Sequence, residues 1–419
     1  MRLLHLPGEP QLTYCTNIHA GETWDEIRAS LDAHVPRIKA RICPGAPFGL
    51  GLRLSGVAAA ELAAPGPLAQ FQEQLSRLGA YVFTLNAFPY GPFHGTRVKE
   101  QVYEPDWRTD ERVSFTRNAA NILAALLPQG GYGSISTVPG GFKAVGRVPA
   151  AVAMMVDRLL QAAAHLVETE RSTGRRIALA LEPEPCCFLE TVTETVAFFE
   201  RELLCAGTLD RFASLAGLSR GEAEATLRRH LGVCYDVCHG AVEFEDPVEA
   251  LRRLRAAGIM VPKIQLSAAM RVPEMSAALL PRLRDFDTGV YLHQVVVRNG
   301  SLTRFVDLPE ALAAFGAGGA RGEWRIHCHV PVFLADLGDL ASTRDALLTT
   351  LQALKADAFS PHLEVETYTW DILPDELKTG SKAGDIAREL AFVVRELDEH
   401  RRDVPGRAAR DTAASRAGL

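Results

Sequence analysis

The stretch that decides the fold is IALALEPEP, residues 177–185, an apolar run that ends in Glu182. Three later stretches have the same form: VCYDVCHGAVEFED (233–246), WRIHCHVPV (324–332) and HLEVETYTW (362–370). They end in Asp236 with His239, in His327 with His329, and in Glu366. Short apolar runs of this kind are typical of buried parallel strands. In a closed parallel barrel the C-terminal strand ends meet at one face, where the chemistry collects.

The rest of the chain supplies the other strands of such a barrel. Strand-like runs alternate with amphipathic or Ala/Leu-rich runs, and the candidate strands are residues 12–18, 48–54, 81–88, 132–138, 177–183, 232–238, 261–267 and 362–368. Eight β/α alternations predict an α/β fold, a (β/α)8 TIM barrel, rather than an open sheet. We expect residues 1–400 to form a single barrel domain, and residues 401–419, which are charged and rich in small residues, to form a disordered tail.

Two regions interrupt this alternation. Residues 88–107, a long loop after the third strand, are rich in Pro, Gly and aromatic residues, which predicts a lid over the barrel mouth. The other is a long insertion between strands seven and eight, at about residues 270–335. Within it, Asn299-Gly300 indicates a tight hairpin. The run ending at Pro331 favours an edge segment rather than a central barrel strand.

Composition narrows the class of protein. The 419-residue chain is 47% hydrophobic and carries a net charge of −6, so no nucleic-acid partner is expected. There is no run of 18 apolar residues, which predicts no membrane span. The N-terminus lacks the features of a signal peptide, so we expect a cytoplasmic protein whose eight cysteines stay reduced.

Carboxylates that converge at strand ends favour a metal site. Without a cation, Glu182, Asp236 and Glu366 would repel one another and take up protons. We therefore expect them to hold one divalent metal ion (Mn, Zn or Mg). His239, three residues after Asp236, is expected to orient a substrate oxygen or to bind a second metal; helix capping by Asp236 is the structural alternative. Glu182 has its own alternative, a surface position just beyond the strand.

The spacing His327-x-His329 places both rings on one side of an extended segment, as a metal clamp requires. Packing of one ring and backbone pairing of the other is the alternative. Glu364 shares a strand face with Glu366 and could lie lower in the barrel or belong to an ion pair. Substrate contacts are predicted for the polar and aromatic residues that follow the first and third strands, namely His19, Asn86, Phe88, His94 and Trp107.

The order strand–Glu, strand–Asp-x-x-His, strand–polar, strand–Glu resembles the xylose-isomerase-like TIM-barrel superfamily of sugar isomerases, ketose epimerases and apurinic endonucleases. The resemblance implies that Glu182, Asp236 and Glu366 bind a divalent metal, with a His on the seventh strand completing the site. This chain has Gln265 there, in KIQLSAA. His329, His327 or the Gln265 side-chain oxygen would have to replace that His. The H-x-H also resembles a D-x-H segment of the endonucleases.

A further resemblance covers nearly the whole chain. The segments LTYCTNIHAGETW, TLNAFPYGPFHG, VKEQVYEPDWRTDER, SISTVPGG and LEVETYTWDILP resemble the EboE-type "metabolite traffic" family of the bacterial Ebo gene cluster. The resemblance implies a polyol, sugar or cyclitol substrate and functional partners among other Ebo-cluster proteins. It identifies neither the reaction nor the oligomeric state.

Together these features predict a metal-dependent isomerase or epimerase, in which Glu182 and Glu366 exchange protons with the substrate and His239 orients an oxygen. Two other functions remain open. One is a non-catalytic metabolite-binding or traffic protein on the same barrel, which the Gln265 replacement favours. The other is a metal-dependent phosphoesterase that resembles the apurinic endonucleases and would need two or three metals and a basic groove.

Overall fold

A computed structural model of the chain describes residues 1–398 except 95, 96, 147, 288, 372, 374–377 and 379. Its main sheet has eight parallel strands in the order β1-β14-β7-β6-β5-β4-β3-β2. An isolated parallel bridge between Cys15 and Gly51 joins the two ends of this order, next to β1 and β2. The strands are β1 (Gln11–Tyr14), β2 (Phe48–Arg53), β3 (Ala80–Asn86), β4 (Tyr132–Thr137), β5 (Arg176–Leu181), β6 (Leu231–Asp236), β7 (Lys263–Leu266) and β14 (His362–Val365). The predicted (β/α)8 barrel with its eight strands is confirmed.

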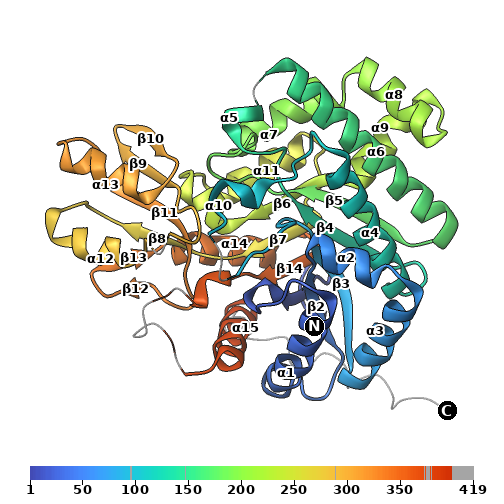
Figure 1. Cartoon of the computed structure of the whole chain (residues 1–419), viewed down its shortest axis with the longest axis horizontal. Coiled ribbons are helices and arrows are strands. Elements are labelled where there is room, and N and C mark those ends of the chain that lie inside the picture. The colour runs from blue at the N-terminus through green and yellow to red at the C-terminus, as the bar shows by residue number, and fades with distance from the viewer. Residues whose placement is uncertain are drawn as a thin grey trace, which may run out of the picture.

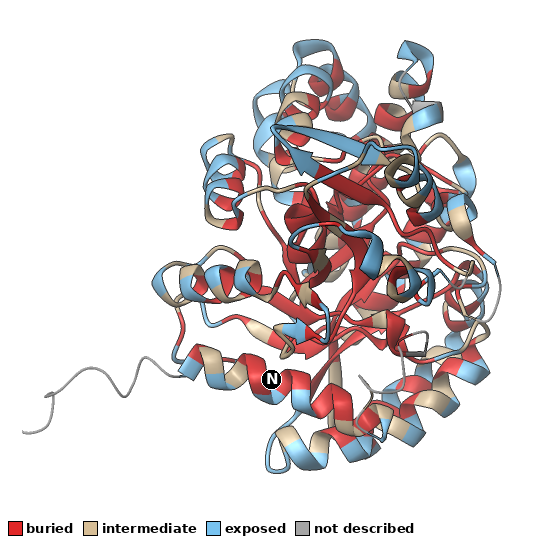
Figure 2. Cartoon of the chain, turned by 90° about the vertical axis from the view of Figure 1, so that its left-hand side faces the viewer, coloured by how far each residue is buried: buried red, intermediate tan, exposed pale blue. Residues whose placement is uncertain are grey.

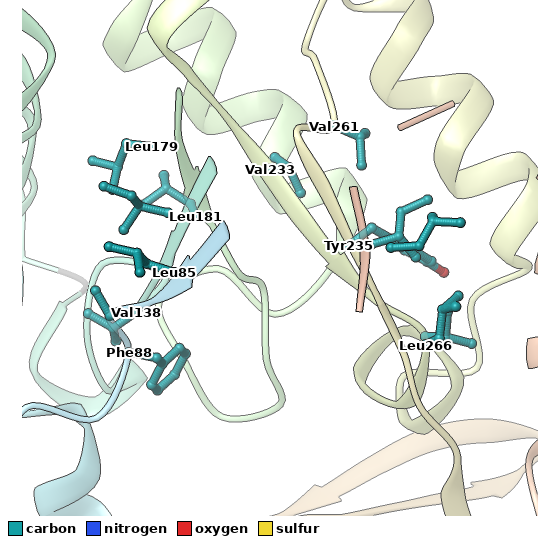
Figure 3. Close-up of a cluster of buried hydrophobic side chains, with 14 of the residues drawn as sticks. Leu85, Phe88, Val138, Leu179, Leu181, Val233, Tyr235, Val261 and Leu266 are labelled. Atoms are coloured by element: carbon teal, nitrogen blue, oxygen red, sulfur yellow. The ribbon is translucent and has the colours of Figure 1, made fainter. Parts of the chain in front are cut away.

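Most large apolar side chains of the barrel strands lie on the outer face, under the helices; Phe83 of β3, which packs on His362 inside the barrel, is an exception. Figure 3 shows Leu179 and Leu181 of β5 beside Leu85 of β3, and Val233 and Tyr235 of β6 in a second group with Leu266. The alternate positions are small or polar and point into the barrel. Ala178 and Ala180 of β5, for example, precede Glu182 on the inner face. This alternation explains why a strand that is buried on both faces still ends in a carboxylate.

The helices surround this sheet (Figure 1), with buried residues toward it and exposed residues on their outer sides (Figure 2). Those of the barrel are α1 (Trp24–Ile42), α2 (Gly56–Leu62), α3 (Pro65–Leu78), α4 (Asp110–Leu126), α5 (Lys143–Gly146), α6 (Pro149–Thr173), α7 (Val192–Phe198), α8 (Ala206–Ala216), α9 (Arg220–His230), α10 (Val237–Val242), α11 (Pro247–Ala256), α14 (Arg344–Ala356) and α15 (Lys382–Asp398). By length and composition α6 could cross a membrane, but half of the most apolar 18-residue stretch of this helix is buried inside the protein. A core helix of a soluble protein has the same properties.

A second, antiparallel sheet lies at one side of the barrel (Figure 1). Its strand order is β10-β9-β11-β8-β13-β12. The elements between β7 and β14 that build and flank it are β8 (Ala269–Val272), α12 (Leu280–Arg284), β9 (Val295–Asn299), β10 (Ser301–Phe305), α13 (Leu308–Gly316), β11 (Glu323–His329), β12 (Asp336–Leu337) and β13 (Leu340–Ser342). The predicted hairpin joins β9 to β10, and Gly300 adopts the positive φ of 73° that its turn requires.

The strand that carries His327 and His329 is not an edge segment, and that prediction was wrong. β11 pairs with β9 on one side and with β8 on the other. Pro331 is compatible with this interior position because it lies beyond the end of the strand, where no ladder hydrogen bond is lost. The register between β11 and β8 shifts between Ile326 and His329, so the last residues of β11 depart from regular pairing as they reach the barrel mouth.

The segment after β3 crosses the barrel mouth and contacts the insertion. The backbone N–H of Val98 donates to the carbonyl of Val290 at 3.0 Å, and the Tyr291 hydroxyl donates to the carbonyl of Phe93 at 3.1 Å. Lys99, the first residue of the 3₁₀-helix η2 (Lys99–Tyr103), forms an ion pair with Asp307. We call this combination of residues 88–94, 97–103 and 290–307 the roof. Residues 399–419, which include the predicted tail, lie outside the described residues.

Candidate metal centre

Three carboxylates from three strands meet at the mouth of the barrel. Glu182 follows β5, Asp236 ends β6 and Glu366 follows β14. One oxygen of each lies within 4.8 Å of one oxygen of the other two, and all three residues are at most 4% exposed. Because the C-terminal ends of parallel barrel strands share one face, the sheet itself brings together residues that are separated by up to 184 positions.

The two carboxylate oxygens of Asp236 have different surroundings. Its Oδ1 caps α10 by accepting from the backbone N–H of His239 at 2.9 Å, and it also accepts from the Ser267 hydroxyl at 2.8 Å. Its Oδ2 is buried without a hydrogen-bond partner in the described part of the chain. Helix capping, the structural alternative for this residue, is therefore real. It occupies one oxygen and leaves the other directed at the cluster.

The two glutamates differ in their surroundings. Glu366 Oε1 accepts from the side-chain amides of Asn17 at 2.7 Å and Asn86 at 3.3 Å, which hold the carboxylate in place. Glu182 Oε2 is buried with no partner among the described residues. An unpaired buried carboxylate oxygen costs free energy, so this site needs a cation or protons.

The imidazoles around the cluster all have the same tautomer. His239 Nδ1 lies 2.9 Å from the carbonyl of Pro183, and His329 Nδ1 lies 2.8 Å from the carbonyl of Glu366. His327 Nδ1 lies 2.8 Å from the side-chain oxygen of Gln294. A carbonyl oxygen can only accept, so each Nδ1 carries the proton and each Nε2 keeps a lone pair. The Nε2 atoms of His327 and His329 are buried without partners in the described structure.

His329 reaches Asp236 from the insertion. Ligand atoms of Asp236, His239 and His329 lie within 4.8 Å of one another, so Asp236 belongs both to this group and to the carboxylate group. Gln265 stands beside Asp236 and Glu364 in the sheet register, and both polar atoms of its side chain are buried without a described partner. The amide therefore lies next to the cluster but offers weaker ligation than an imidazole.

Glu364 lies lower in the barrel. Its Oε2 is 2.6 Å from Nζ of Lys263, and neither side chain is exposed. Lys263 also donates to the Ser136 hydroxyl at 3.3 Å. The structure shows both features that the sequence left open for Glu364: a lower position in the barrel and an ion pair.

Burial dominates the titration of the cluster. It raises the pKa of Glu182 well above the usual range, and the nearby charge of Asp236 adds to this effect. Burial is also the main cause that raises the pKa of Glu366 well above the usual range, and the nearby charge of Glu182 is the second. For Asp236 burial acts in the same direction, but the adjacent imidazoles and the donors to Oδ1 outweigh it and lower its pKa. Burial lowers the pKa of His239 to about 4, which keeps that ring neutral.

Glu184 belongs to the site although sequence reasoning passed over it. Its Oε1 accepts from the Tyr103 hydroxyl at 2.6 Å and from Gln294 Nε2 at 3.3 Å, and it lies 3.5 Å from His327 Nδ1. Burial raises its pKa to about 8 although those two donors oppose the shift. A signal existed in the EPEP repeat, because Glu184 is two residues beyond Glu182 and an extended chain directs both to one side.

A cavity between the roof and the cluster includes two of the predicted substrate contacts. Asn86 and Phe88 line it, together with Glu182, His239 and Glu366. The other three predicted contacts are absent from its lining. His19 points to the Tyr14 hydroxyl and stacks on His34, His94 lies beside Glu22, and Trp107 is fully buried away from the cavity.

No known family profile and no curated protein sequence matches this chain. Among solved structures, a xylose isomerase-like TIM barrel protein from Mycobacterium smegmatis in complex with magnesium aligns with a TM-score of 0.51 and 10% identity, over 93% of this chain and 97% of that one. L-ribulose 3-epimerase aligns with a TM-score of 0.49 and 12% identity, over 96% and 100% of the two chains. A xylose isomerase domain protein from Planctomyces limnophilus aligns with a TM-score of 0.49 and 13% identity, over 94% of this chain and 98% of that one.

The magnesium-bound relative supports the architecture already described. The chain has the α/β barrel fold of xylose isomerase-like TIM-barrel proteins. At this level of identity the likeness concerns the fold, and the chemistry must be argued from the residues of this chain.

Proposed function

We propose that this protein is a metal-dependent isomerase or epimerase that acts on a small polyol, sugar or cyclitol. The observation that carries the proposal is two groups of ligand atoms that share Asp236, one with Glu182 and Glu366 and the other with His239 and His329. Glu182 Oε2, Asp236 Oδ2 and His329 Nε2 are buried without a partner among the described residues. Oxygen and imidazole ligands of this kind suit a borderline or hard divalent cation. The fold of the magnesium-bound relative is consistent with this assignment.

Four residues would hold the cation: Glu182, Asp236, Glu366 and His329. When bound, a divalent cation supplies Lewis acidity toward a carbonyl oxygen and the hydroxyl beside it. The hydrogen bond from His329 Nδ1 to the carbonyl of Glu366 fixes the ring with its lone pair toward the cluster. The Asn17 and Asn86 amides fix Glu366 in the same way.

The two glutamates are placed to move protons. Strands β5 and β14 are separated by β6 and β7 in the sheet, so Glu182 and Glu366 face the cavity from different sides. A carboxylate beside the substrate can accept a proton from carbon or deliver one to it. Removal of a substrate proton by one glutamate, which becomes protonated, and delivery of a different proton to the opposite face by the other, initially protonated glutamate would invert a carbon next to a carbonyl. The neutral His239 can accept a hydrogen bond from a substrate hydroxyl through Nε2.

The binding-protein alternative was favoured by Gln265 on β7. Its main support weakens because His329, from the insertion, reaches Asp236 and supplies an imidazole. The phosphoesterase alternative has one observation in its favour. Glu184, His239 and His327 form a further group of ligand atoms within 4.8 Å of one another, which offers room for a second cation.

The EboE-type assignment and partners among Ebo-cluster proteins are part of this proposal, and their basis is the resemblance of the segments quoted above. We also propose a cytoplasmic location, because the N-terminus lacks the features of a signal peptide. A nucleic-acid substrate is not proposed, because the chain has a net charge of −6 and three glutamates, Glu182, Glu184 and Glu366, line the pocket at the mouth against one lysine, Lys99.

The first test is metal content. Elemental analysis of the purified full chain should find one divalent cation per chain, and Glu182→Gln and Asp236→Asn should each remove most of it. The exposed Glu200→Gln and Asp339→Asn are matched controls and should retain it. Unchanged metal in the two site variants would show that the cation binds elsewhere. Two or more cations per chain would favour the phosphoesterase, and none the carrier.

The second test is proton exchange. The metal-loaded protein is incubated in D2O with a panel of ketoses, aldoses and inosose-type cyclitols, and deuterium at the carbon beside the carbonyl is followed by NMR. Wild-type protein should exchange this proton in at least one compound, whereas Glu366→Gln should not. Metal-loaded protein that exchanges none of them would count against an isomerase or epimerase.

A further inference from the structure

The cavity over the cluster has two chemically different halves. Its floor consists of the carboxylates, imidazoles and amides at the strand ends. Its roof comes from two segments far apart in the chain, and most of the roof residues that line the cavity are apolar; Lys99 and Tyr103 are the polar ones. The apolar residues include Pro89, Phe93, Val98 and Val102 from the segment after β3, and Tyr291 and Leu292 from the insertion.

The roof forms a hydrophobic cluster of its own. Phe93, Val98 and Tyr291 are buried together, with Val102 and Tyr368 packed against them, and this cluster is separate from the main core. The ring centroids of Phe93 and Tyr291 are 5.3 Å apart. Tyr368 links the cluster to the floor, since its ring centroid is 4.7 Å from that of His329. An apolar surface therefore begins directly beside the proposed metal ligands.

The polar groups of the roof are engaged by the protein. Lys99 pairs with Asp307, and the Tyr103 hydroxyl donates to Glu184 and accepts from Gln294 Nε2 at 2.7 Å. The Tyr291 hydroxyl donates to the carbonyl of Phe93. A free sugar carries hydroxyls around its whole rim. It would bury some of them against aliphatic side chains such as Val102 and Leu292, at a cost in free energy for each unpaired group.

We infer that the substrate is amphipathic: a hydroxylated, carbonyl-bearing end that meets the floor, joined to an apolar aromatic or alkyl group that meets the roof. This inference rests on the proposed function for the placement of the polar end, and it excludes a free hexose or pentose as the preferred ligand. Aliphatic and aromatic roof residues provide the apolar contact area that such a group needs.

Binding of matched glycosides tests the inference, because glycosides present the two halves without reacting. Isothermal titration of the metal-loaded full chain compares phenyl and methyl β-D-glycopyranosides of glucose, galactose and mannose. At least one phenyl compound should bind about tenfold more tightly than its methyl partner or better, as its extra buried area predicts. Equal affinities in all three pairs, or no binding of any phenyl compound, would overturn the inference.

Two roof variants locate the effect. Val102→Thr keeps the side-chain shape but replaces one methyl group by a hydroxyl. It should weaken phenyl-glycoside binding by about threefold to tenfold and leave methyl-glycoside binding unchanged. Leu292→Thr is an independent variant on the other roof segment, in case the first does not fold. Val152→Thr, half-buried in α6 and outside the cavity lining, is the control. A phenyl preference that survives both roof variants would place the apolar contact elsewhere and refute the assignment.

Metal content separates this inference from the proposed function. A chain that binds no metal but prefers phenyl glycosides would refute the proposed function and support the apolar roof site. A chain that binds one metal through Glu182 and Asp236 but shows no phenyl preference would refute the amphipathic substrate and leave the proposed function standing.

Discussion

Replacing Lys263 by Met should destabilise the barrel through the charge that it leaves behind. Lys263 and Glu364 are fully buried, with Nζ and Oε2 2.6 Å apart. The attraction of Glu364 outweighs burial and raises the pKa of Lys263, so the lysine stays charged at all ordinary pH values. Lys263→Met leaves the Glu364 carboxylate without a partner inside the protein. Removing one member of a buried pair costs about 3–5 kcal/mol.

The expected shift in melting temperature follows from chain length. At about 2.1 cal/mol/K per residue, unfolding of a 419-residue chain carries an entropy of about 0.9 kcal/mol/K. A loss of about 3–5 kcal/mol therefore lowers Tm by about 3–6 °C. Differential scanning calorimetry of the metal-free protein measures this, with denaturant unfolding as a second measurement. Lys355→Met, on the half-buried side of α14, is the control and should shift Tm by less than about 1 °C.

The double variant decides whether the mechanism is correct. Lys263→Met combined with Glu364→Gln removes both charges, so it should be no less stable than Lys263→Met alone. The coupling free energy of this cycle should exceed about 2 kcal/mol. Additive losses in the two single variants would refute the argument, because they would mean that the two side chains stabilise the barrel independently.

Three further predictions follow from the same geometry. Gly51→Ala should cost more than about 2 kcal/mol in chemical denaturation, since its Cβ would lie 1.6 Å from Glu364 Oε1, whereas Gly207→Ala, whose Cβ meets nothing within 4 Å, should be neutral or stabilising. The free energy of unfolding of metal-free protein should fall as pH rises from about 6.5 to 8, by about 1.4 kcal/mol per pH unit for each carboxyl that is still protonated in the folded state. The reason is that a carboxyl with a raised pKa, such as Glu184 with a pKa of about 8, binds a proton in the folded state that it has already lost in the unfolded state. Saturating metal should flatten this slope, and equal slopes with and without metal would contradict the prediction. Tyr103→Phe should raise amide hydrogen exchange in residues 98–103 and cost about 1–3 kcal/mol, because it removes the 2.6 Å hydrogen bond that fastens the roof to Glu184; unchanged exchange would show that the roof is held by its apolar contacts alone.

Local sequence patterns were sufficient for the barrel and for the three carboxylates. Each strand alternates residues of opposite faces, and the carboxylate that ends a run such as IALALE is directed to the mouth as soon as the strand joins a parallel barrel. Nothing beyond strand order and strand ends is required to bring Glu182, Asp236 and Glu366 together. The role of Glu184 was within reach as well, because it follows Glu182 at the spacing of one strand face.

The tertiary structure decided how the site is completed. That β11 lies inside a second sheet, and that His329 rather than Gln265 brings a free imidazole nitrogen to Asp236, depends on how the insertion packs on the barrel. The same packing brings the two segments of the roof together. His19, His94 and Trp107 lie outside the cavity lining. These outcomes rest on side-chain packing between segments nearly 200 residues apart, which no local periodicity records. Strand ends are set by backbone geometry, whereas the partners of each imidazole are set by long-range contacts.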